Sequence, residues 1–365
     1  MNYLLPVQVG APDYLNYLIK DKLTWFYFMI INKFNLYFYR SNTKVSTHLP
    51  CLKLEAYGLK LSGAALFFST KVNTSQSIGS YLAGLFEGDG HVSLPKVANL
   101  TGKITYPYLA ITFVNKDLPL VNQLKELYGG RLRFKTEENA IVWIIGTHKE
   151  LIVLINLMNG YLRTPKINKF NDLILWLNDR YNYNIPIYSP DTSDLKDNGW
   201  LSGFIDADGG FKIRYTEKLI NEKTNKTLRK GRIEVRFALE QRQNLSDTGN
   251  NVNNSYKPIM LKIQSFFGIT ADLRVSKHNI DKTYWIIEVT SLNKLNFLIQ
   301  YLDIYPLLTA KRNDYMDWVK VYQLIEEKKH LSEDGKLLIK EIKSNINKNR
   351  KVFNWDHLIY LNKLQ

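Results

Sequence analysis

Two stretches of this sequence repeat one another: YLAGLFEGDG at Tyr81–Gly90 and WLSGFIDADG at Trp200–Gly209. In each stretch the apolar residues recur three and four positions apart, which predicts an amphipathic helix that ends in an acidic, glycine-rich turn. A glycine inside a helix costs about 1 kcal/mol relative to alanine. Gly84 and Gly203 therefore indicate the close approach of another backbone, and we expect the two motif helices to pack across these small residues.

The residues after each motif repeat as well. Both halves carry an alternating strand, a longer strand, a helix that ends at a glycine, two more strands and closing helices, which gives α-β-β-α-β-β-α twice. We therefore predict an α+β fold of two pseudo-symmetric halves, joined by the paired motif helices, each with an antiparallel sheet and its helices on one face. The predicted strands are His91–Leu94, Tyr108–Val114, Arg131–Lys135 and Ala140–Ile145, then Gly210–Tyr215, Arg232–Glu240, Asp272–Ser276 and Tyr284–Val289. The predicted helices after the motifs are Leu118–Tyr128, Lys149–Asn159 and Phe170–Asn178, then Pro258–Phe267, Leu292–Leu302 and Arg312–Glu327.

This pattern divides the chain into four segments. They are a poorly patterned extension (1–76), a first half (77–190), a second half (191–328) and a C-terminal helical extension (329–365) with a helix near Ser332–Ser344. Ser77 is expected to cap the first motif helix. The second half has two longer connections, 216–230 and 243–257, which we predict as loops. The apolar run Leu23–Ile31 is too short to cross a membrane, so no membrane partner is expected.

The chain is basic. It has 49 Lys and Arg against 34 Asp and Glu, a formal net charge of +15 and an isoelectric point near 9.5. A surplus of this size points to a polyanionic partner, because each neutralised phosphate releases condensed counterions. The single cysteine, Cys51, excludes an internal disulfide and a cysteine-based zinc site, and the six histidines are scattered. Any metal is therefore expected to be a hard ion bound through oxygen.

Asp89 and Asp208 stand at the ends of the two motif helices. The helix dipole disfavours an anion there by a few tenths to about 1 kcal/mol, and mutual repulsion adds to this cost if the helices pair. Such a pair of carboxylates needs cations. One or two Mg²⁺ ions would supply them, and Mg²⁺ at such a site catalyses phosphodiester hydrolysis. The sequence therefore predicts a metal site at Asp89 and Asp208.

The two motifs resemble those of the LAGLIDADG homing endonucleases, in the form that carries both motifs in a single chain. They read LAGLFEGDG and LSGFIDADG here, and the resemblance extends over roughly residues 77–327. It implies a metal-dependent enzyme that cuts both strands of a long, non-palindromic DNA site as a monomer. In that family the eighth motif residue binds the metal, which corresponds to Asp89 and Asp208. The sixth residue, Glu87 or Asp206 here, is implied to be structural.

The resemblance also implies supporting residues near the metals. Family members have a polar residue at the end of the second strand, which matches Gln241 in the second half and Asn115 in the first, although Asn115 serves equally well as a polar turn residue. They also have a lysine before the last helix, which matches Lys311. In the first half Lys166 matches through a shared Thr-x-Lys sequence, whereas alignment of the following helices by their tryptophans gives Lys169.

Basic residues alternate along the predicted strands, so each set projects from one face of a sheet. We predict that these faces lie in the major groove, where arginine pairs with guanine and amides pair with adenine. A solvated sheet face is the alternative. The predicted DNA-binding residues are Arg131, Arg133, Lys212, Arg214, Arg232 and Arg236.

The segment Asn2–Asp13 (NYLLPVQVGAPD) resembles part of cytochrome c oxidase subunit 1 as encoded by fungal mitochondria. This resemblance implies an intron reading frame joined to an upstream exon, a mitochondrial location, and a role in intron homing by cutting intronless copies of the host gene. The main alternative is an RNA maturase that assists splicing of its own intron, with or without DNA cleavage, since a basic surface suits RNA equally. A transcription regulator built on the same fold is a third alternative, which the intact metal acids disfavour.

Overall fold

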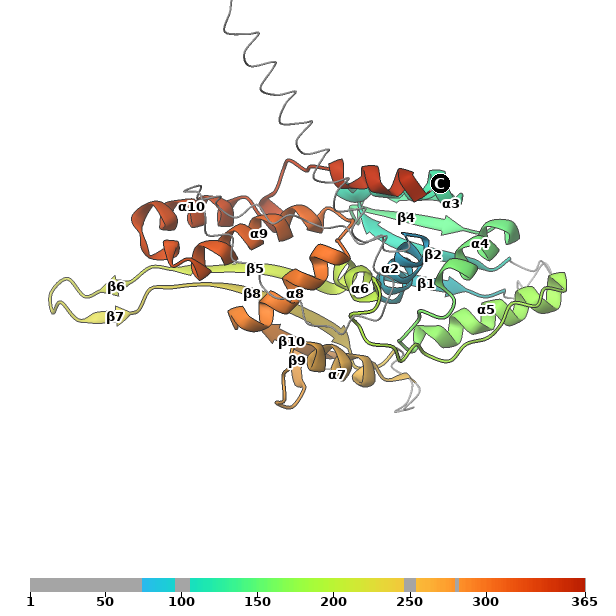
Figure 1. Ribbon diagram of the computed structural model, residues 1–365, viewed down its shortest axis with the longest axis horizontal. Helices are drawn as coiled ribbons and strands as arrows, with labels where there is room; N and C mark the ends of the chain where they lie inside the picture. Colours follow the sequence, from blue (N-terminus) through green and yellow to red (C-terminus); the bar gives the residue numbers. More distant parts are fainter. Residues whose placement is uncertain (1–73, 96–105, 246–253, 280–281, 365) are drawn as a thin grey trace, which may run out of the picture. The chain divides into compact units, whose positions relative to one another are not determined.

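The computed structural model describes residues 74–95, 106–245, 254–279 and 282–364, drawn in colour in Figure 1. They belong to one compact unit that runs from Ser69 to Gln365. The predicted exon-like segment at 2–13 and the apolar run at 23–31 lie outside the described residues. Within the part that is described, no helix is long and apolar enough to span a membrane.

Both halves have the predicted order of elements (Figure 1). The first half consists of α2 (Thr74–Asp89), β1 (Gly90–Ser93), β2 (Tyr108–Val114), η1 (Asn115–Asp117), α3 (Leu118–Tyr128), β3 (Arg131–Lys135), β4 (Ala140–Ile145), α4 (His148–Met158) and α5 (Lys166–Tyr181). The second half consists of α6 (Trp200–Asp208), β5 (Gly209–Thr216), β6 (Leu219–Ile220), β7 (Thr227–Arg229), β8 (Arg232–Arg242), α7 (Lys257–Phe266), β9 (Arg274–Asn279), β10 (Lys282–Val289), α8 (Leu292–Ile304) and α9 (Lys311–Glu326). The predicted α+β class with two repeated halves is confirmed.

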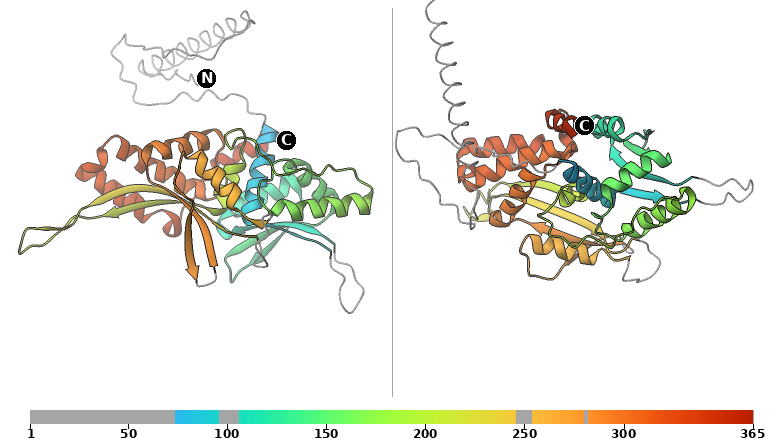
Figure 2. Two further views of the ribbon diagram at one scale, coloured as in Figure 1. Left: turned by 90° about the horizontal axis from the view of Figure 1, so that it is seen from below. Right: turned by 45° about the vertical axis from the view of Figure 1, so that its right-hand side comes forward.

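Each half contains a four-stranded antiparallel sheet, in the orders β1-β2-β4-β3 and β5-β8-β10-β9. The helices lie on one side of the sheets, and the opposite sides are uncovered by helices (Figure 2, left). The first strand of each sheet begins at an equivalent point of the neighbouring strand. Gly90 pairs with Ile111 in β2 and Gly209 pairs with Leu239 in β8, each three residues before that strand ends. The strand that begins immediately after each motif is therefore fixed in the sheet from its first residue.

The motif helices α2 and α6 pack against each other at the two glycines that the sequence analysis singled out. A Cβ atom on Gly84 would lie 1.9 Å from the carbonyl oxygen of Trp200, and one on Gly203 would lie 1.9 Å from that of Tyr81. These contacts are with backbone atoms, so no change of rotamer relieves them. The predicted apolar stripes of the two helices are buried, namely Leu82, Leu85, Phe86, Leu201, Phe204 and Ile205. The predicted close approach of the two helices is confirmed.

The prediction that residues 216–230 form a loop is wrong. β5 continues to Thr216, and β6 then pairs with β7 in a two-stranded ribbon. The Asn221 side chain accepts hydrogen bonds from the backbone nitrogens of Lys223 and Thr224, and Asn225 adopts a left-handed backbone with φ of 56°. Asparagine supports a tight turn in both ways. The polar composition that suggested a loop therefore belongs to the turn of a hairpin.

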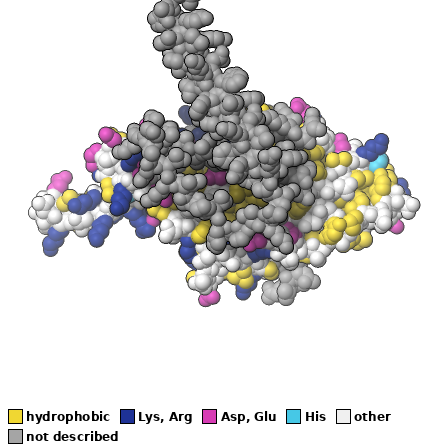
Figure 3. Space-filling view, in the orientation of Figure 1, with side chains coloured by type: hydrophobic (Ala, Val, Ile, Leu, Met, Phe, Trp, Pro, Cys, Tyr) yellow, Lys and Arg dark blue, Asp and Glu magenta, His cyan; other side chains and the backbone are white. Residues whose placement is uncertain are grey.

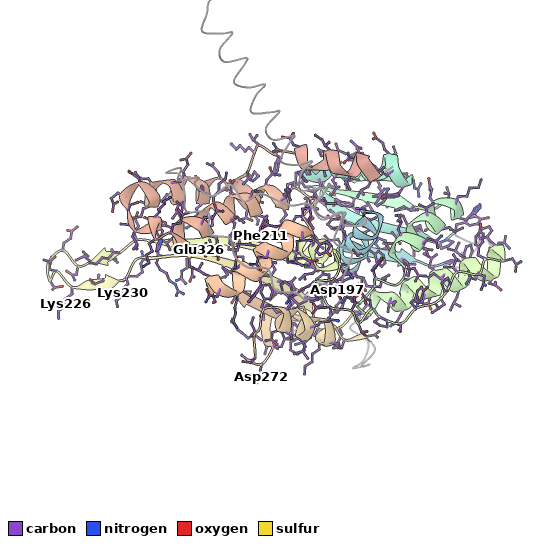
Figure 4. All side chains as sticks on the ribbon, in the orientation of Figure 1. Asp197, Phe211, Lys226, Lys230, Asp272 and Glu326 are labelled. Carbon is purple, nitrogen blue, oxygen red and sulfur yellow. The ribbon has the colours of Figure 1, made fainter. Side chains whose placement is uncertain are left out.

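This hairpin of β6 and β7 extends beyond the main part of its sheet (Figure 1). Lysine and arginine side chains gather on it in the space-filling view (Figure 3), and Figure 4 labels Lys226 and Lys230 there. The other long connection, 243–257, lies partly outside the described residues.

Two predicted helix starts also differ from the structure. α2 begins at Thr74, so Ser77 lies inside the helix and is not its cap. α5 begins at Lys166 and not at Phe170. The Thr164 hydroxyl accepts a hydrogen bond from the backbone nitrogen of Lys166 at 3.3 Å, which stabilises the earlier start.

The C-terminal extension contains η3 (Lys329–Leu331), the helix α10 (Glu333–Ser344), η4 (Asn347–Asn349) and η5 (Asp356–Leu364). Ser332 caps α10 by accepting a hydrogen bond from Gly335 N at 3.1 Å. Arg350 binds Asp314 of α9 at 2.6 Å, and the backbone oxygen of Leu358 accepts a hydrogen bond from Gln123 of α3 at 3.1 Å. The extension therefore makes contacts with both halves.

We predict that Gly84→Ala or Gly203→Ala destabilises the protein by on the order of 3 kcal/mol, because a methyl group would overlap a helix backbone that cannot move independently. Gly146→Ala is the matched control, since its Cβ would lie 3.9 Å from the nearest atom, the Cβ of Tyr108. The free energy of unfolding from denaturant titration measures the difference. If the motif variants fall within about 0.5 kcal/mol of the control, the close contact is not the constraint described here.

Candidate active site

The ends of the two motif helices meet at one place. α2 ends at Asp89 and α6 ends at Asp208, and the next residue after each acid enters a sheet. A Cβ atom on Gly88 would lie 2.1 Å from the Cβ of Ala207 and 3.3 Å from Oδ2 of Asp208. The helix packing therefore brings the two acids together.

A cavity of about 500 Å³ lies at these helix ends, and its lining includes Asp89, Asp208, Lys166 and Gln241. Asp89 is exposed to solvent, whereas Asp208 is half-buried. Four of the six predicted catalytic residues therefore share one cavity. The Lys311 side chain binds the carbonyl oxygen of Ala207, next to Asp208 at the end of α6.

The local environment disfavours negative charge on both acids. Desolvation raises the pKa of Asp208 to about 6, with repulsion by Asp89 as the next cause, while Lys311, Lys166 and a hydrogen bond from Gln241 act in the opposite direction. Desolvation also raises the pKa of Asp89, and the same two lysines oppose it. The two lysines therefore compensate the acids only in part, and a further cation would be favoured here.

Lys166 and Lys311 occupy matching places, because they are the first residues of α5 and α9. The Lys166 ammonium group donates a hydrogen bond to the carbonyl oxygen of Gly88 at 2.6 Å, and that of Lys311 donates to the carbonyl oxygen of Ile205 at 2.8 Å. Carbonyls at a helix C-terminus lack partners within the helix and carry the negative end of its dipole. Each lysine therefore satisfies its own motif helix and stands beside the acid that ends it. Burial lowers the pKa of both ammonium groups.

Lys169, the alternative for the first half, does not reach the site. Its side chain is exposed and pairs with Asp172 at 3.3 Å. Trp176 is only partly buried, whereas Trp318 of α9 is fully buried, so the two tryptophans are not equivalent in their surroundings. The Thr-x-Lys sequence is the feature that aligns the two halves.

Glu87 and Asp206, the sixth residues of the motifs, hold the chain just before each lysine. Glu87 accepts hydrogen bonds from the backbone nitrogen and the hydroxyl of Thr164, both at 2.6 Å. Asp206 accepts hydrogen bonds from the same two groups of Thr309, at 3.1 and 2.5 Å. Both acids are buried. Their contacts agree with the structural role that the resemblance implied.

The aromatic residue immediately before each motif binds the sixth residue of the other motif. The Tyr81 hydroxyl donates a hydrogen bond to Asp206 at 2.7 Å, and Trp200 Nε1 donates one to Glu87 at 2.7 Å. Burial raises the pKa of Glu87, and its hydrogen bonds oppose this rise. The sequence analysis missed these two aromatic residues. The sequence did contain a signal for this contact, since an aromatic residue with a hydrogen-bond donor directly precedes both motifs.

Gln241 lies where the sequence analysis placed it. Its side chain is buried, and its Nε2 donates a hydrogen bond to Oδ2 of Asp208 at 2.8 Å. Its position at the end of β8 follows from the sheet register.

Asn115 is not the counterpart of Gln241. Gly90 and Gly209, the last residues of the motifs, pair with Ile111 and Leu239. Two residues further along each strand are Phe113 and Gln241, both on the buried side of their sheets. Asn115 lies two residues beyond Phe113, in the short helix η1. The prediction of a matching amide in the first half is therefore wrong, because it aligned strand ends and not strand pairing.

The two acids fit a hard divalent cation. Among the described residues, no group of three or more His, Cys, Asp or Glu side chains is placed to share a metal. Mg²⁺ usually takes only one or two carboxylates from a protein, and water and substrate phosphate oxygens complete its shell. Asp89 and Asp208 supply oxygen ligands of this kind, whereas a transition metal would favour nitrogen or sulfur ligands.

The uncovered face of the second sheet carries an ion-pair network around Glu234. This carboxylate is only 9% exposed, and it pairs with Arg214 at 3.4 Å, with Arg232 at 2.5 Å and with Arg236 at 3.2 Å. Arg236 also pairs with Glu288 at 2.8 Å. Three of the predicted DNA-binding arginines are therefore held by carboxylates on the same sheet face.

The uncovered face of the first sheet is different. Ala110, Val142 and Ile144 form a small apolar cluster at its centre, separate from the main core. Arg131 and Arg133 are exposed on the edge strand β3, and within the described part of the chain neither forms an ion pair. The predicted DNA-binding residues therefore lie on two sheet faces that distribute their charges differently.

The sequence matches a family model described as LAGLIDADG endonuclease at residues 82–177 and 201–322. It is 33% identical over 317 residues to the intron-encoded DNA endonuclease aI3 of Saccharomyces cerevisiae, covering 80% of this chain and 74% of that protein. It is 31% identical over 275 residues to an uncharacterized cox1 intron-2 protein of Schizosaccharomyces pombe, covering 74% of this chain and 72% of the other.

Two further similarities bear on function. The intron-encoded RNA maturase bI4 of Saccharomyces cerevisiae is 29% identical over 153 residues, which cover 42% of this chain and 22% of that protein. The crystal structure of the LAGLIDADG homing endonuclease I-GzeII in complex with its DNA target superposes with a TM-score of 0.53 and 19% identity. It covers 75% of this chain and 99% of that one, which shows a shared fold.

We predict that Asp208→Asn stabilises the metal-free protein at pH 7 by up to about 3 kcal/mol. The folded-state pKa near 6 lies above the ordinary value of 3.8, so ionisation of Asp208 costs stability above pH 6, and this cost disappears below about pH 4. The difference in unfolding free energy between variant and wild type should therefore shrink as the pH falls from 7 to 4. Asp172→Asn, at an exposed acid of α5, is the control. A difference that stays constant with pH would contradict the proposed environment of Asp208.

Proposed function

The chain belongs to the LAGLIDADG endonuclease family, and on that premise we propose that it is a site-specific, Mg²⁺-dependent enzyme that cuts both strands of a long, asymmetric DNA site. The observation that carries this proposal is the convergence of Asp89 and Asp208 on one cavity. Each acid ends its motif helix, and a lysine side chain binds that helix end. The halves differ in sequence and are joined in one chain, which favours a monomer and a non-palindromic target.

Each residue of the site has a part in this proposal. Asp89 and Asp208 would hold the metal, and Mg²⁺ bound there would supply activation of a water molecule and stabilisation of the leaving oxygen of the phosphodiester. Lys166 and Lys311 provide positive charge next to the scissile phosphates. Gln241 orients the carboxylate of Asp208 through its hydrogen bond.

The uncovered sheet faces are the proposed DNA interface. On the second sheet, Glu234 and Glu288 fix the orientation of the arginines, which suits the reading of base edges better than the neutralisation of phosphates, because a carboxylate repels a phosphate. On the first sheet, the unpaired Arg131 and Arg133 suit phosphate contacts. Lys212 and the basic hairpin of β6 and β7 extend the positive surface of the second half.

We further propose that the enzyme acts in the mitochondrion, in the homing of the intron that encodes it. The relatives named above include intron-encoded proteins of yeasts, one of them from a cox1 intron. The resemblance of residues 2–13 to an exon of cytochrome c oxidase subunit 1 points to the same host gene. The proposed target is accordingly the junction of the two exons in an intronless copy of that gene.

Assistance of RNA splicing is the second candidate. The similarity to an RNA maturase and the basic sheet faces support it. The two functions separate experimentally, because a protein that assists splicing by binding RNA alone would not need the metal acids for this effect. Splicing that responds to the protein with both acids replaced would assign the second function, and splicing that proceeds at the same rate without the protein would reject it.

We predict that Asp89→Asn and Asp208→Asn each lower the cleavage rate of the exon-junction DNA by at least about 100-fold, because each removes a metal ligand. Both variants should bind the DNA as tightly as the wild type or more tightly, since a negative charge near the phosphates is lost. Single-turnover cleavage in Mg²⁺ and gel-shift titration measure the two effects. Asp172→Asn is the control, and wild-type cleavage by both site variants would refute the assignment.

We predict that Arg131→Ala combined with Arg133→Ala weakens DNA binding and lowers the slope of log affinity against log salt by about 2, because each lost phosphate contact changes the slope by roughly 0.9. Lys169→Ala removes a cation from α5, away from the sheet face, and should leave the slope unchanged. Fluorescence anisotropy across a range of KCl concentrations provides the measurement. Equal slopes for the double variant and the control would place DNA elsewhere than on the first sheet.

A further inference from the structure

Asp117, which precedes α3 in the first half, binds the second half. It is 5% exposed, and its Oδ1 accepts a hydrogen bond from the backbone nitrogen of Ala310 at 2.8 Å. Ala310 is the N-cap residue of α9 and is followed directly by Lys311. Asp117 occupies the N-cap position of α3 but makes no side-chain hydrogen bond to that helix. Its carboxylate is therefore directed to a helix start in the other half.

Tyr256 is the matching residue in the second half, because it precedes α7 as Asp117 precedes α3. It is 2% exposed and lines the cavity between the acids. Its phenol group lies beside the Thr164 side chain of the first half. Thr164 stands two residues before Lys166 and accepts the hydrogen bond from its backbone nitrogen. Each half thus contacts the residues that precede the lysine of the other half, through a carboxylate in one case and a phenol in the other.

Each lysine-bearing helix is consequently held at its start from two sides. The sixth motif residue of the same half holds the threonine, through Glu87 or Asp206. The residue before α7 or α3 of the opposite half supplies the second contact. The lysines sit within one or two residues of these contacts and bind the motif helix end next to each metal acid.

We propose that Asp117 and Tyr256 are positioning residues that act across the halves: Asp117 sets the position of Lys311, and Tyr256 sets that of Lys166. This inference rests on the proposed function. Each half thereby contributes a residue that positions the lysine of the other half. Through that lysine, the residue influences the cleavage of one DNA strand. Among the described residues, neither Asp117 nor Tyr256 is hydrogen-bonded to either metal acid, and each precedes a helix and lies outside the strands.

A purely structural role accounts poorly for Asp117. Burial raises its pKa to about 6, although Ala310, Lys116 and Lys311 partly counteract this. Its ionised form therefore costs stability at neutral pH. An ionised acceptor makes a stronger and more directional hydrogen bond than a neutral one, which suits a residue that must fix the start of a helix.

The test is strand-resolved cleavage of the exon-junction duplex, labelled with a different fluorophore on each strand, under single-turnover conditions in Mg²⁺. The variants are Asp117→Ala and Tyr256→Phe, each of which removes one contact, and Asp117→Asn, which keeps an oxygen that can accept from Ala310. We expect Asp117→Ala to slow one strand on the order of tenfold while the other changes by less than about threefold, because small displacements of a catalytic group have effects of this size. Tyr256→Phe should slow the opposite strand, and Asp117→Asn should restore the strand ratio.

The outcomes are distinct. All rates are measured well below the melting temperature of each variant. If a variant were only less stable, with both lysines still in place, the cleavage rates of the two strands would fall by the same factor. Equal slowing of both strands by Asp117→Ala, or slowing of the same strand by both contact variants, would overturn the inference. An Asp117→Asn variant with the strand ratio of Asp117→Ala would also overturn it. If the wild type cut neither strand, the proposed function itself would fail, and this inference would fail with it.

Discussion

The contact between the backbones of α2 and α6 is the constraint on which the rest of the structure depends. Gly84 and Gly203 allow each helix to touch the carbonyl of the other, and this single approach brings two acidic helix ends to one cavity. It also brings Tyr81 and Trp200 within reach of the buried acids of the opposite motif. Those acids in turn hold the threonines that precede Lys166 and Lys311. A local choice of glycine therefore determines the positions of residues that are far apart in the sequence.

The site that results is electrostatically unfavourable without a cation. Two carboxylates stand at helix ends where the dipole is already negative, and the half-buried Asp208 has a raised pKa. The two lysines bind carbonyl oxygens at the helix ends and also face the acids. Their positive charge therefore compensates both the helix carbonyls and the carboxylates. This balance explains why a protein with a large core retains a region that opposes folding. On the proposed function, a divalent cation bound to the two acids would offset this cost.

The repeat made much of this structure predictable from the sequence. The motif helices, the strands of both sheets, and Asp89 and Asp208 follow from periodicity and from the matching of one half with the other. Gln241, Lys166 and Lys311 came from the resemblance to the family. The errors arise where the structure is determined by pairing between residues that are far apart in the sequence. Asn115 was assigned from the end of a strand, whereas the strand register makes Phe113 the residue equivalent to Gln241. The polar segment that was predicted as a loop contains the β6–β7 hairpin, whose turn is formed by asparagines. The Glu234 ion pairs and the contacts of Asp117 and Tyr256 join residues whose proximity no local pattern reveals.

The halves share one plan but differ in detail, with an apolar centre on one sheet face and an ion-pair network on the other. Such asymmetry is what a single chain needs to read a non-palindromic duplex. The measurement that tests the central claim most directly is cleavage of the exon-junction DNA by the wild-type protein across a Mg²⁺ titration that begins in chelator. The account predicts no product without the metal and breaks in both strands at one position as Mg²⁺ is added. Product that forms at an undiminished rate in chelator would contradict it.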